Sequence, residues 1–143
     1  MRWIIALILY GLASLQAVRS EEIDLTIGTH KIRAAIANTP KSRAQGLMNK
    51  TFLCANCGML FIFPQPGNYK FWMKNTPLPL AIAFIAADGR IVQISEMQAN
   101  TLHTHHAQTE ILYALEMNYG WFRINSIKSN SYIINPHLLP AAE

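Results

Sequence analysis

Cys54 and Cys57 are the residues of this chain whose types and spacing point most directly to chemistry. A Cys-x-x-Cys pair can act as a redox couple, supply two metal ligands or close a short disulfide. Redox catalysis favours a first cysteine at the start of a helix, but the residues from Gly58 onward are typical of a strand. We therefore predict a disulfide, which suits an oxidising compartment.

Three histidines, His103, His105 and His106, supply the alternative of a metal site. Cys54 and Cys57 together with His103 and His105 would form a ligand set that zinc or copper accepts. On an extended segment His103 and His105 share a face, whereas His106 points away. The histidines also fit a solvated loop, and they need not meet the cysteines in space. We therefore predict no cofactor and keep zinc or copper as the alternative.

A third cluster combines an aromatic ring, a cation and an amide within residues 71–76. Trp72 offers a large flat surface, Lys74 a positive charge, and Asn75 a group that both donates and accepts hydrogen bonds. Alternation along a strand puts Trp72 and Lys74 on one face, opposite their neighbours. These three residues are our candidates for binding a small polar ligand. The alternative is that Trp72 packs under a loop and Asn75 forms a turn.

Arg43 and Glu116 are the charged residues that most need a partner if they are buried. We interpret them as candidates for a structural ion pair and not as catalytic residues. The sequence has no Gly-x-Ser-x-Gly turn or comparable nucleophile motif, so no catalytic residue is predicted. An enzyme of unassigned reaction stays an alternative.

The composition limits the class of protein and its partners. With 143 residues, of which 51% are hydrophobic and 14% charged, the chain has room for one globular domain and is too apolar to be disordered. The net charge is +4, but residues 1–20 hold two of the twelve basic residues and no acidic ones. The remaining Lys and Arg are scattered singly, so we expect no nucleic-acid partner.

The first twenty residues are typical of a cleavable export signal. Arg2 precedes an apolar run from Trp3 to Leu15, and small and polar residues follow up to Ser20. The run is shorter than the ~20 apolar residues that span a bilayer. We predict cleavage after Ala17 or Ser20, a periplasmic or secreted location, and no integral membrane segment in the mature protein.

The rest of the chain alternates short strand-like segments with turns such as Gly28-Thr29 and Asp88-Gly89. We expect strands at 23–27, 32–37, 58–63, 70–73, 80–86, 90–97, 111–116 and 132–134, and short helices at 41–48 and 119–127. This pattern predicts a mostly β fold, a single compact β-barrel or sandwich with one or two short helices. The domain would cover residues 21–135, with a loose tail at 136–143.

Several motifs of the chain recur together in a known family. They are Arg43-Ala44-Gln45-Gly46-Leu47-Met48, Gly58-Met59-Leu60-Phe61, residues 71–76 followed by Pro79-Leu80, Phe84-Ile85, Asp88-Gly89-Arg90-Ile91, Ala114-Leu115-Glu116 and Gly120. The chain resembles the family called domain of unknown function 192 over about Ile23 to Ile134. The resemblance implies a small, mostly β protein that often carries an export signal, and it implies no settled biochemical activity.

The chain departs from the family's pattern at two places. Ala81 stands where the family usually has an acidic residue, and Ser129-Asn130 stands where it usually has Gly-Asp. The missing carboxylate weighs against an enzyme, because a reaction needs a positioned acid, base or nucleophile. We therefore expect an exported, non-enzymatic ligand-binding or accessory protein of the cell envelope, whose partner is a small molecule or an envelope component. The alternatives are a zinc- or copper-binding envelope protein and an enzyme of unknown reaction.

Overall fold

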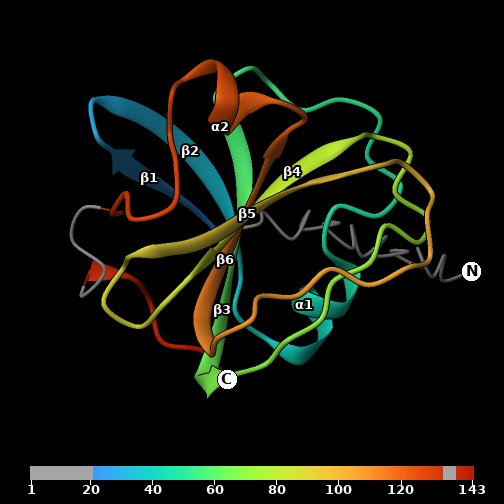
Figure 1. Cartoon of the computed structure of the whole chain (residues 1–143). Coiled ribbons are helices and arrows are strands. Elements are labelled where there is room, and N and C mark those ends of the chain that lie inside the picture. Colours follow the sequence, from blue (N-terminus) through green and yellow to red (C-terminus); the bar gives the residue numbers. More distant parts are fainter. Residues whose placement is uncertain (1–20, 134–137) are drawn as a thin grey trace, which may run out of the picture.

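The computed structural model describes residues 21–133 and 138–143, and the expected export signal at residues 1–20 lies outside them (Figure 1). The described chain forms six strands and two short helices. In chain order these are β1 (Glu22–Ile27), β2 (His30–Ala37), α1 (Pro40–Gln45), β3 (Cys57–Gly67), β4 (Leu80–Ile85), β5 (Ile91–Met97), β6 (Ile111–Asn118) and α2 (Trp121–Ile124). The expected mostly β fold with two short helices is confirmed.

All six strands belong to one sheet, in the order β1-β2-β3-β6-β4-β5. The strands β2 and β3 are parallel, the other neighbouring strands of the described sheet are antiparallel, and the chain between β2 and β3 contains α1. The last strand, β6, lies between β3 and β4, where Glu116 is opposite Met59 on one side and Ile82 on the other. Within the residues that the structure describes, the sheet does not close into a barrel. Tyr132 and Ile133 make single bridges to Arg90 and Ile27, toward its two edges.

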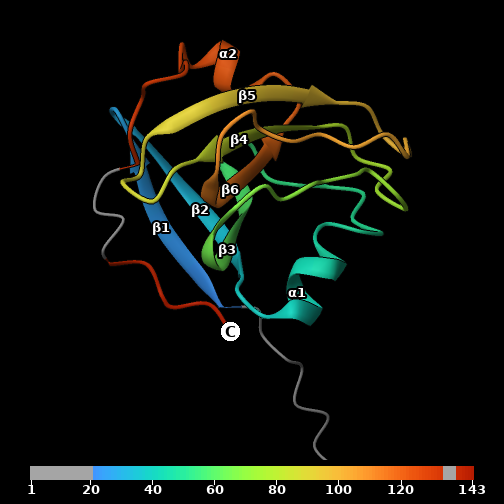
Figure 2. The same ribbon diagram turned by 60° about the horizontal axis from the view of Figure 1, so that its bottom comes forward.

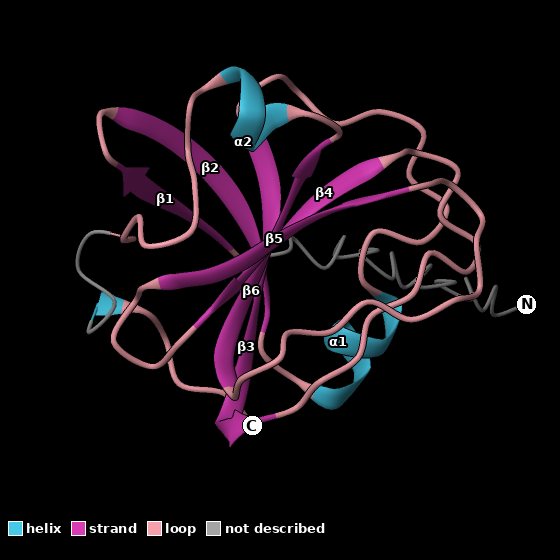
Figure 3. Cartoon of the chain, in the orientation of Figure 1, coloured by secondary structure: helices cyan, strands magenta, loops and turns pink. Residues whose placement is uncertain are grey.

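Side chains from the two faces of the sheet form two separate apolar clusters, because successive residues of a strand point to opposite faces. One cluster includes Leu60, Leu115 and, from α2, Trp121 and Phe122. The other contains, among others, Phe61, Ile82, Phe84, Leu47, Phe71 and Met73. The helices α1 and α2 accordingly lie on opposite sides of the sheet (Figure 2). The second face is covered by α1 and long loops, which gather on the same side of the molecule (Figure 3).

The helix α1 is defined by its caps. The Thr39 side chain accepts a hydrogen bond from the Ser42 amide, the Ser42 hydroxyl accepts one from the Thr39 amide, and Pro40 occupies the first turn. The helix ends at Gly46, whose φ of 48° turns the chain away from the helical path. It is therefore shorter than the expected 41–48, and α2 is likewise shorter than the expected 119–127.

The expected strand at 70–73 is wrong. Phe71 makes one isolated bridge to His105, and both partners lie in loops. The expected alternation still holds, since Phe71 and Met73 are buried while Trp72 and Lys74 face outward. The segment therefore lies over the sheet instead of within it.

The last residues of the chain contact the domain. The Glu143 amide donates to the Asn38 carbonyl at 2.8 Å, and the Asn38 side-chain amide donates to the Ala141 carbonyl at 3.1 Å. These bonds place residues 141–143 beside the end of β2. Pro136 and His137, at the start of the predicted tail, lie outside the described residues.

Gly58 yields a test of the tight contact between β3 and β6. A Cβ at this position would overlap the Glu116 carbonyl oxygen and the Met117 sulfur, and the carbonyl is fixed by the sheet. Gly58→Ala should therefore lower the free energy of unfolding by about 1–3 kcal/mol in urea denaturation. Gly67→Ala is the control, because its Cβ would meet only the Tyr69 side chain. Equal losses for both variants would contradict this account of the packing.

Candidate functional site

A small polar pocket lies where α1 and the loop before β4 cover the central strands. Its volume is about 170 Å³. The residues that line it are Arg43, Ala44, Gln45, Gly46, Leu47, Met48, Phe61, Lys70, Trp72, Thr76 and Glu116. All but Lys70 belong to motifs that carried the sequence resemblance. The fold thus gathers four separate motif segments around one cavity.

Glu116 is the most unusual residue of this pocket. It lies on β6 with 4% of its surface exposed, and its carboxyl oxygens keep some accessible surface in the pocket. The hydrogen bonds and ion pairs between described side chains do not include them. Burial raises the pKa of Glu116 to about 8, because the charged form loses its hydration without gaining a partner. A neutral carboxyl both donates and accepts hydrogen bonds, so this group can bind a polar ligand in either role.

Arg43, the other candidate for the ion pair, lines the same pocket but bonds elsewhere. Its Nη1 atom donates to the Ile62 carbonyl at 2.9 Å, and its Nη2 atom donates to the Glu143 backbone carbonyl at 2.8 Å. The guanidinium also lies 5.5 Å from the centroid of the Phe63 ring. Neither of the described salt bridges includes Arg43 or Glu116. Arg43 therefore ties α1 to β3 and to the chain end.

The three candidate ligand-binding residues divide between the pocket and the surface beside it. Trp72 lines the pocket and is 46% exposed, whereas Lys74 and Asn75 are exposed and do not line it. The Lys74 Nζ atom lies 5.2 Å from the centroid of the Trp72 ring, in a cation-π contact. Asn75 has a φ of 52°, and its carbonyl accepts a hydrogen bond from the Asn49 amide at 2.8 Å. Trp72 is thus the candidate that can reach a ligand in this pocket.

Lys70 and Thr76 line the pocket as well, although neither was among the predicted site residues. Lys70 is two residues before Trp72, so the same alternation brings both to the pocket. That spacing could have identified it. The Thr76 side chain is buried, and its hydroxyl donates to the Lys74 carbonyl at 3.0 Å. This turn, at Lys74 and Asn75, agrees with the alternative prediction that Asn75 forms a turn.

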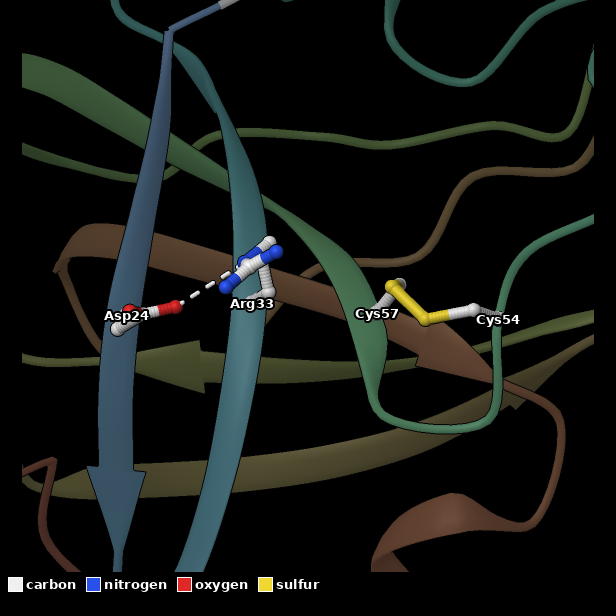
Figure 4. Close-up of polar contacts among 4 residues, drawn as sticks. All are labelled: Asp24, Arg33, Cys54 and Cys57. Carbon is white, nitrogen blue, oxygen red and sulfur yellow. Dashed lines mark hydrogen bonds and ion pairs between the residues drawn. A yellow bond between two sulfur atoms is a disulfide. The ribbon is translucent and has the colours of Figure 1, made fainter.

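The two cysteines lie in the loop that leads into β3, and their sulfur atoms are in contact (Figure 4). Their Cα atoms are 5.0 Å apart, a separation that a disulfide requires. A wide surface cavity of about 520 Å³ lies beside them, lined partly by Asp24, Arg33 and Asn56. The Asp24 carboxylate and the Arg33 Nε atom are 3.2 Å apart (Figure 4), but both side chains are exposed, so this pair contributes little to stability.

The structure does not assemble the four proposed metal ligands into one site. Among the described residues, no group of three or more His, Cys, Asp or Glu side chains could hold a metal ion. The His103 and His105 ring centroids are 4.6 Å apart. Burial, and to a lesser degree the nearby His103, lowers the pKa of His105. The backbone of His105 is paired with that of Phe71.

The absence of a partner for Glu116 predicts how stability depends on pH. Its pKa is 4.5 for an unperturbed group and about 8 in the folded protein, so folding retains a proton that the unfolded chain releases. This contribution is fully present below the lower value and is lost as pH rises through the higher one. As pH rises across this range, the free energy of unfolding of the wild type should fall by about 1 kcal/mol or more relative to that of Glu116→Gln.

The exposed Glu110→Gln is the matched control for this experiment. It should follow the wild type across the whole pH range, because the substituted side chain lies at the surface. A wild type that tracks Glu116→Gln from acid to alkaline pH would show that the carboxyl has a partner in solution.

Comparisons with known proteins agree with this fold. The model of the DUF192 family, described as an uncharacterized ACR, matches residues 23–134. No curated protein matches the chain. Among the described residues, no helix is long and apolar enough to cross a membrane.

Two crystal structures are similar to this chain over most of their length. A proposed transcription regulator from Sinorhizobium meliloti 1021 is 29% identical with a TM-score of 0.74, and the match covers 80% of this chain and 92% of that one. A protein of unknown function from Novosphingobium aromaticivorans DSM 12444 is 32% identical with a TM-score of 0.76, and the match covers 78% of this chain and 84% of that one. With the family model spanning most of its length, the chain belongs to the DUF192 family.

Proposed function

We propose that this chain is an exported, non-enzymatic binding protein that takes a small polar ligand in the pocket around Glu116. The observation that carries the proposal is the buried carboxyl group, which faces the pocket without a partner among the described residues. Burying a polar group without a hydrogen bond is costly, and a ligand that supplies the bond recovers that cost. The unpaired carboxyl is therefore best explained as a binding group.

The dimensions and lining of the pocket limit the ligand. A volume of about 170 Å³ is below the range of about 300–1,000 Å³ that is usual for drug-sized molecules, so the ligand is small. The neutral Glu116 carboxyl favours a hydroxyl or amide group over a cation, which would need the charged form. Trp72, at the exposed side of the pocket, offers a flat apolar surface to the rest of the molecule. A polyol, a sugar or a small amide fits this description.

An enzyme is the second candidate, and the same residue supports it. A carboxyl whose pKa is raised to about 8 can act as a general acid near neutral pH. The residues that line the pocket include no Ser, Cys or His. Lys70 also lines it, but this side chain is exposed and lacks the burial that turns a lysine into a nucleophile or base. The Thr76 hydroxyl is already bonded to the Lys74 carbonyl. We therefore favour binding over catalysis.

Export and a Cys54–Cys57 disulfide form part of the proposal. The sequence of residues 1–20 supports export, and the contact between the two sulfur atoms supports the disulfide. Both fit an oxidising compartment such as the periplasm or the cell exterior. The bond would fix the loop whose Asn56 side chain accepts a hydrogen bond from the Trp121 Nε1 atom at 3.1 Å.

Binding can be tested by NMR with a library of polyols, sugars and small amides. We expect shifts of the amide signals around Glu116 and Trp72, and affinity lower by roughly 3- to 10-fold in Trp72→Ala. Tyr132→Ala removes a comparably exposed ring, 50% against 46%, outside the pocket and should bind normally. If Trp72→Ala instead lowers stability by several kcal/mol, as loss of a core aromatic does, Trp72 belongs to the core and the proposal loses this contact.

Export and the disulfide can be tested by mass spectrometry. The intact mass is measured on protein that is recovered from outside the cytoplasm and purified without reductant or chelator. We expect a chain that starts at Val18 or Glu21 and is two hydrogen atoms lighter than its reduced form. An intact Met1 in the membrane fraction would instead indicate an uncleaved anchor. Two free thiols with bound zinc or copper, lost in His103→Ala, would support the metal-binding alternative.

A further inference from the structure

We propose that three loops at one end of the sheet form a surface that binds peripherally to an anionic lipid bilayer. We call this surface the loop end, and it comprises residues 49–56, 68–79 and 98–109. The proposal does not depend on the pocket ligand. It rests on where the strands end and these loops begin, on the hydrogen bonds between the loops, and on the side chains that the loops expose.

The register of the sheet brings the three loops to the same end. Leu80, the first residue of β4, pairs with Met97, the last residue of β5, and with Asn118, the last residue of β6. Near the start of β3, Gly58 pairs with Met117. The loops that precede β3 and β4 and the loop that follows β5 therefore start or finish at the same end of the sheet. This end lies on the side where Figures 1 and 3 show the long loops.

Backbone hydrogen bonds join the loops into one surface. The Asn49 amide donates to the Asn75 carbonyl at 2.8 Å, which links the first loop to the second. The second and third loops are linked twice, from the Met73 amide to the Thr101 carbonyl at 3.1 Å and from the Asn100 amide to the Thr76 carbonyl at 3.0 Å. The three loops are thus held side by side.

Each loop exposes one large apolar side chain. Phe52 is 77% exposed, Leu102 is 65% exposed, and Trp72 is 46% exposed. Aromatic and leucine side chains are those that peripheral proteins insert at the boundary between headgroups and acyl chains. A single exposed apolar residue needs no explanation, but one on each of three joined loops does.

The charge of the loop end selects an anionic surface. The three loops contain three exposed lysines, Lys50, Lys70 and Lys74, and no Asp or Glu. Lys74 lies over the Trp72 ring, so a cation stands beside an apolar group, as in side chains that keep their charge at the headgroups while their stems contact the acyl region. Lysines close to a membrane surface are attracted by anionic headgroups. Exposed apolar side chains, with lysines close in sequence to two of the three, therefore fit an anionic bilayer better than a closed protein groove.

The test is sedimentation of the mature protein with lipid vesicles. We expect binding to vesicles of phosphatidylcholine mixed equally with phosphatidylglycerol, weaker binding at high salt, and little binding to phosphatidylcholine alone. Phe52→Asp and Leu102→Asp, made as single variants, should each bind at least roughly threefold more weakly. Ile124→Asp is the matched control, because Ile124 is 74% exposed but lies on α2, and it should bind like the wild type.

Two double variants that reverse the charge of lysines test the contribution of the loop-end lysines to binding. Lys50→Glu with Lys74→Glu should weaken binding, whereas Lys31→Glu with Lys128→Glu, which make the same change of net charge elsewhere, should bind more tightly than the first pair. Glu116→Gln, in the pocket, should leave vesicle binding unchanged. This outcome separates the membrane proposal from the ligand proposal.

NMR on the wild type keeps the proposal testable if a variant does not fold. Spin-labelled lipid in the anionic vesicles should broaden amide signals of the loop end more than those of the β1–β2 hairpin. Equal broadening, absence of binding to anionic vesicles, or an equal loss in Ile124→Asp would overturn the proposal. It would also be overturned if the Phe52 and Leu102 substitutions abolished self-association but not vesicle binding, because the surface would then be a protein interface.

Discussion

The burial of one carboxyl group on the central strand of the sheet is the constraint on which the site depends. Glu116 is opposite Met59 on β3, whose sulfur is at most a weak acceptor, and Ile82 on β4, whose side chain has no hydrogen-bonding group. What reaches Glu116 must therefore come from the segments that cover this face of the sheet, namely α1 and the loop before β4. Those segments leave a pocket over it and supply no partner among the described residues.

The fold explains why Arg43 does not neutralise Glu116, although both line the pocket. The guanidinium bonds to the carbonyls of Ile62 and Glu143, so its donors hold α1 against β3 and the end of the chain. Gly46, with its positive φ, then turns the chain over Phe61 toward Leu47, which enters the core. The contacts that position the pocket are thus also those that leave its carboxyl unpaired.

The sequence predicted what local patterns control. Alternation identified most of the strands and the outward face of Trp72, and the Thr39-Pro40 pair located the start of α1. The sequence did not predict the hydrogen-bond partners that come from distant segments of the chain. The stretch around Phe71 has the composition of a strand, but its backbone partner is a loop residue, His105. The distance between the cysteines and histidines, the open edges of the sheet and the bonding of Arg43 also depend on tertiary structure.

The most direct test of the account is a titration of the Glu116 side-chain carboxyl carbon by NMR, with Glu116→Gln used to assign the signal. The account predicts a midpoint near 8, because burial without a partner raises the pKa of Glu116 to about 8. A midpoint near the unperturbed 4.5 would contradict it, because the carboxylate would then be stabilised by a partner or by water, and the pocket would have lost its binding group.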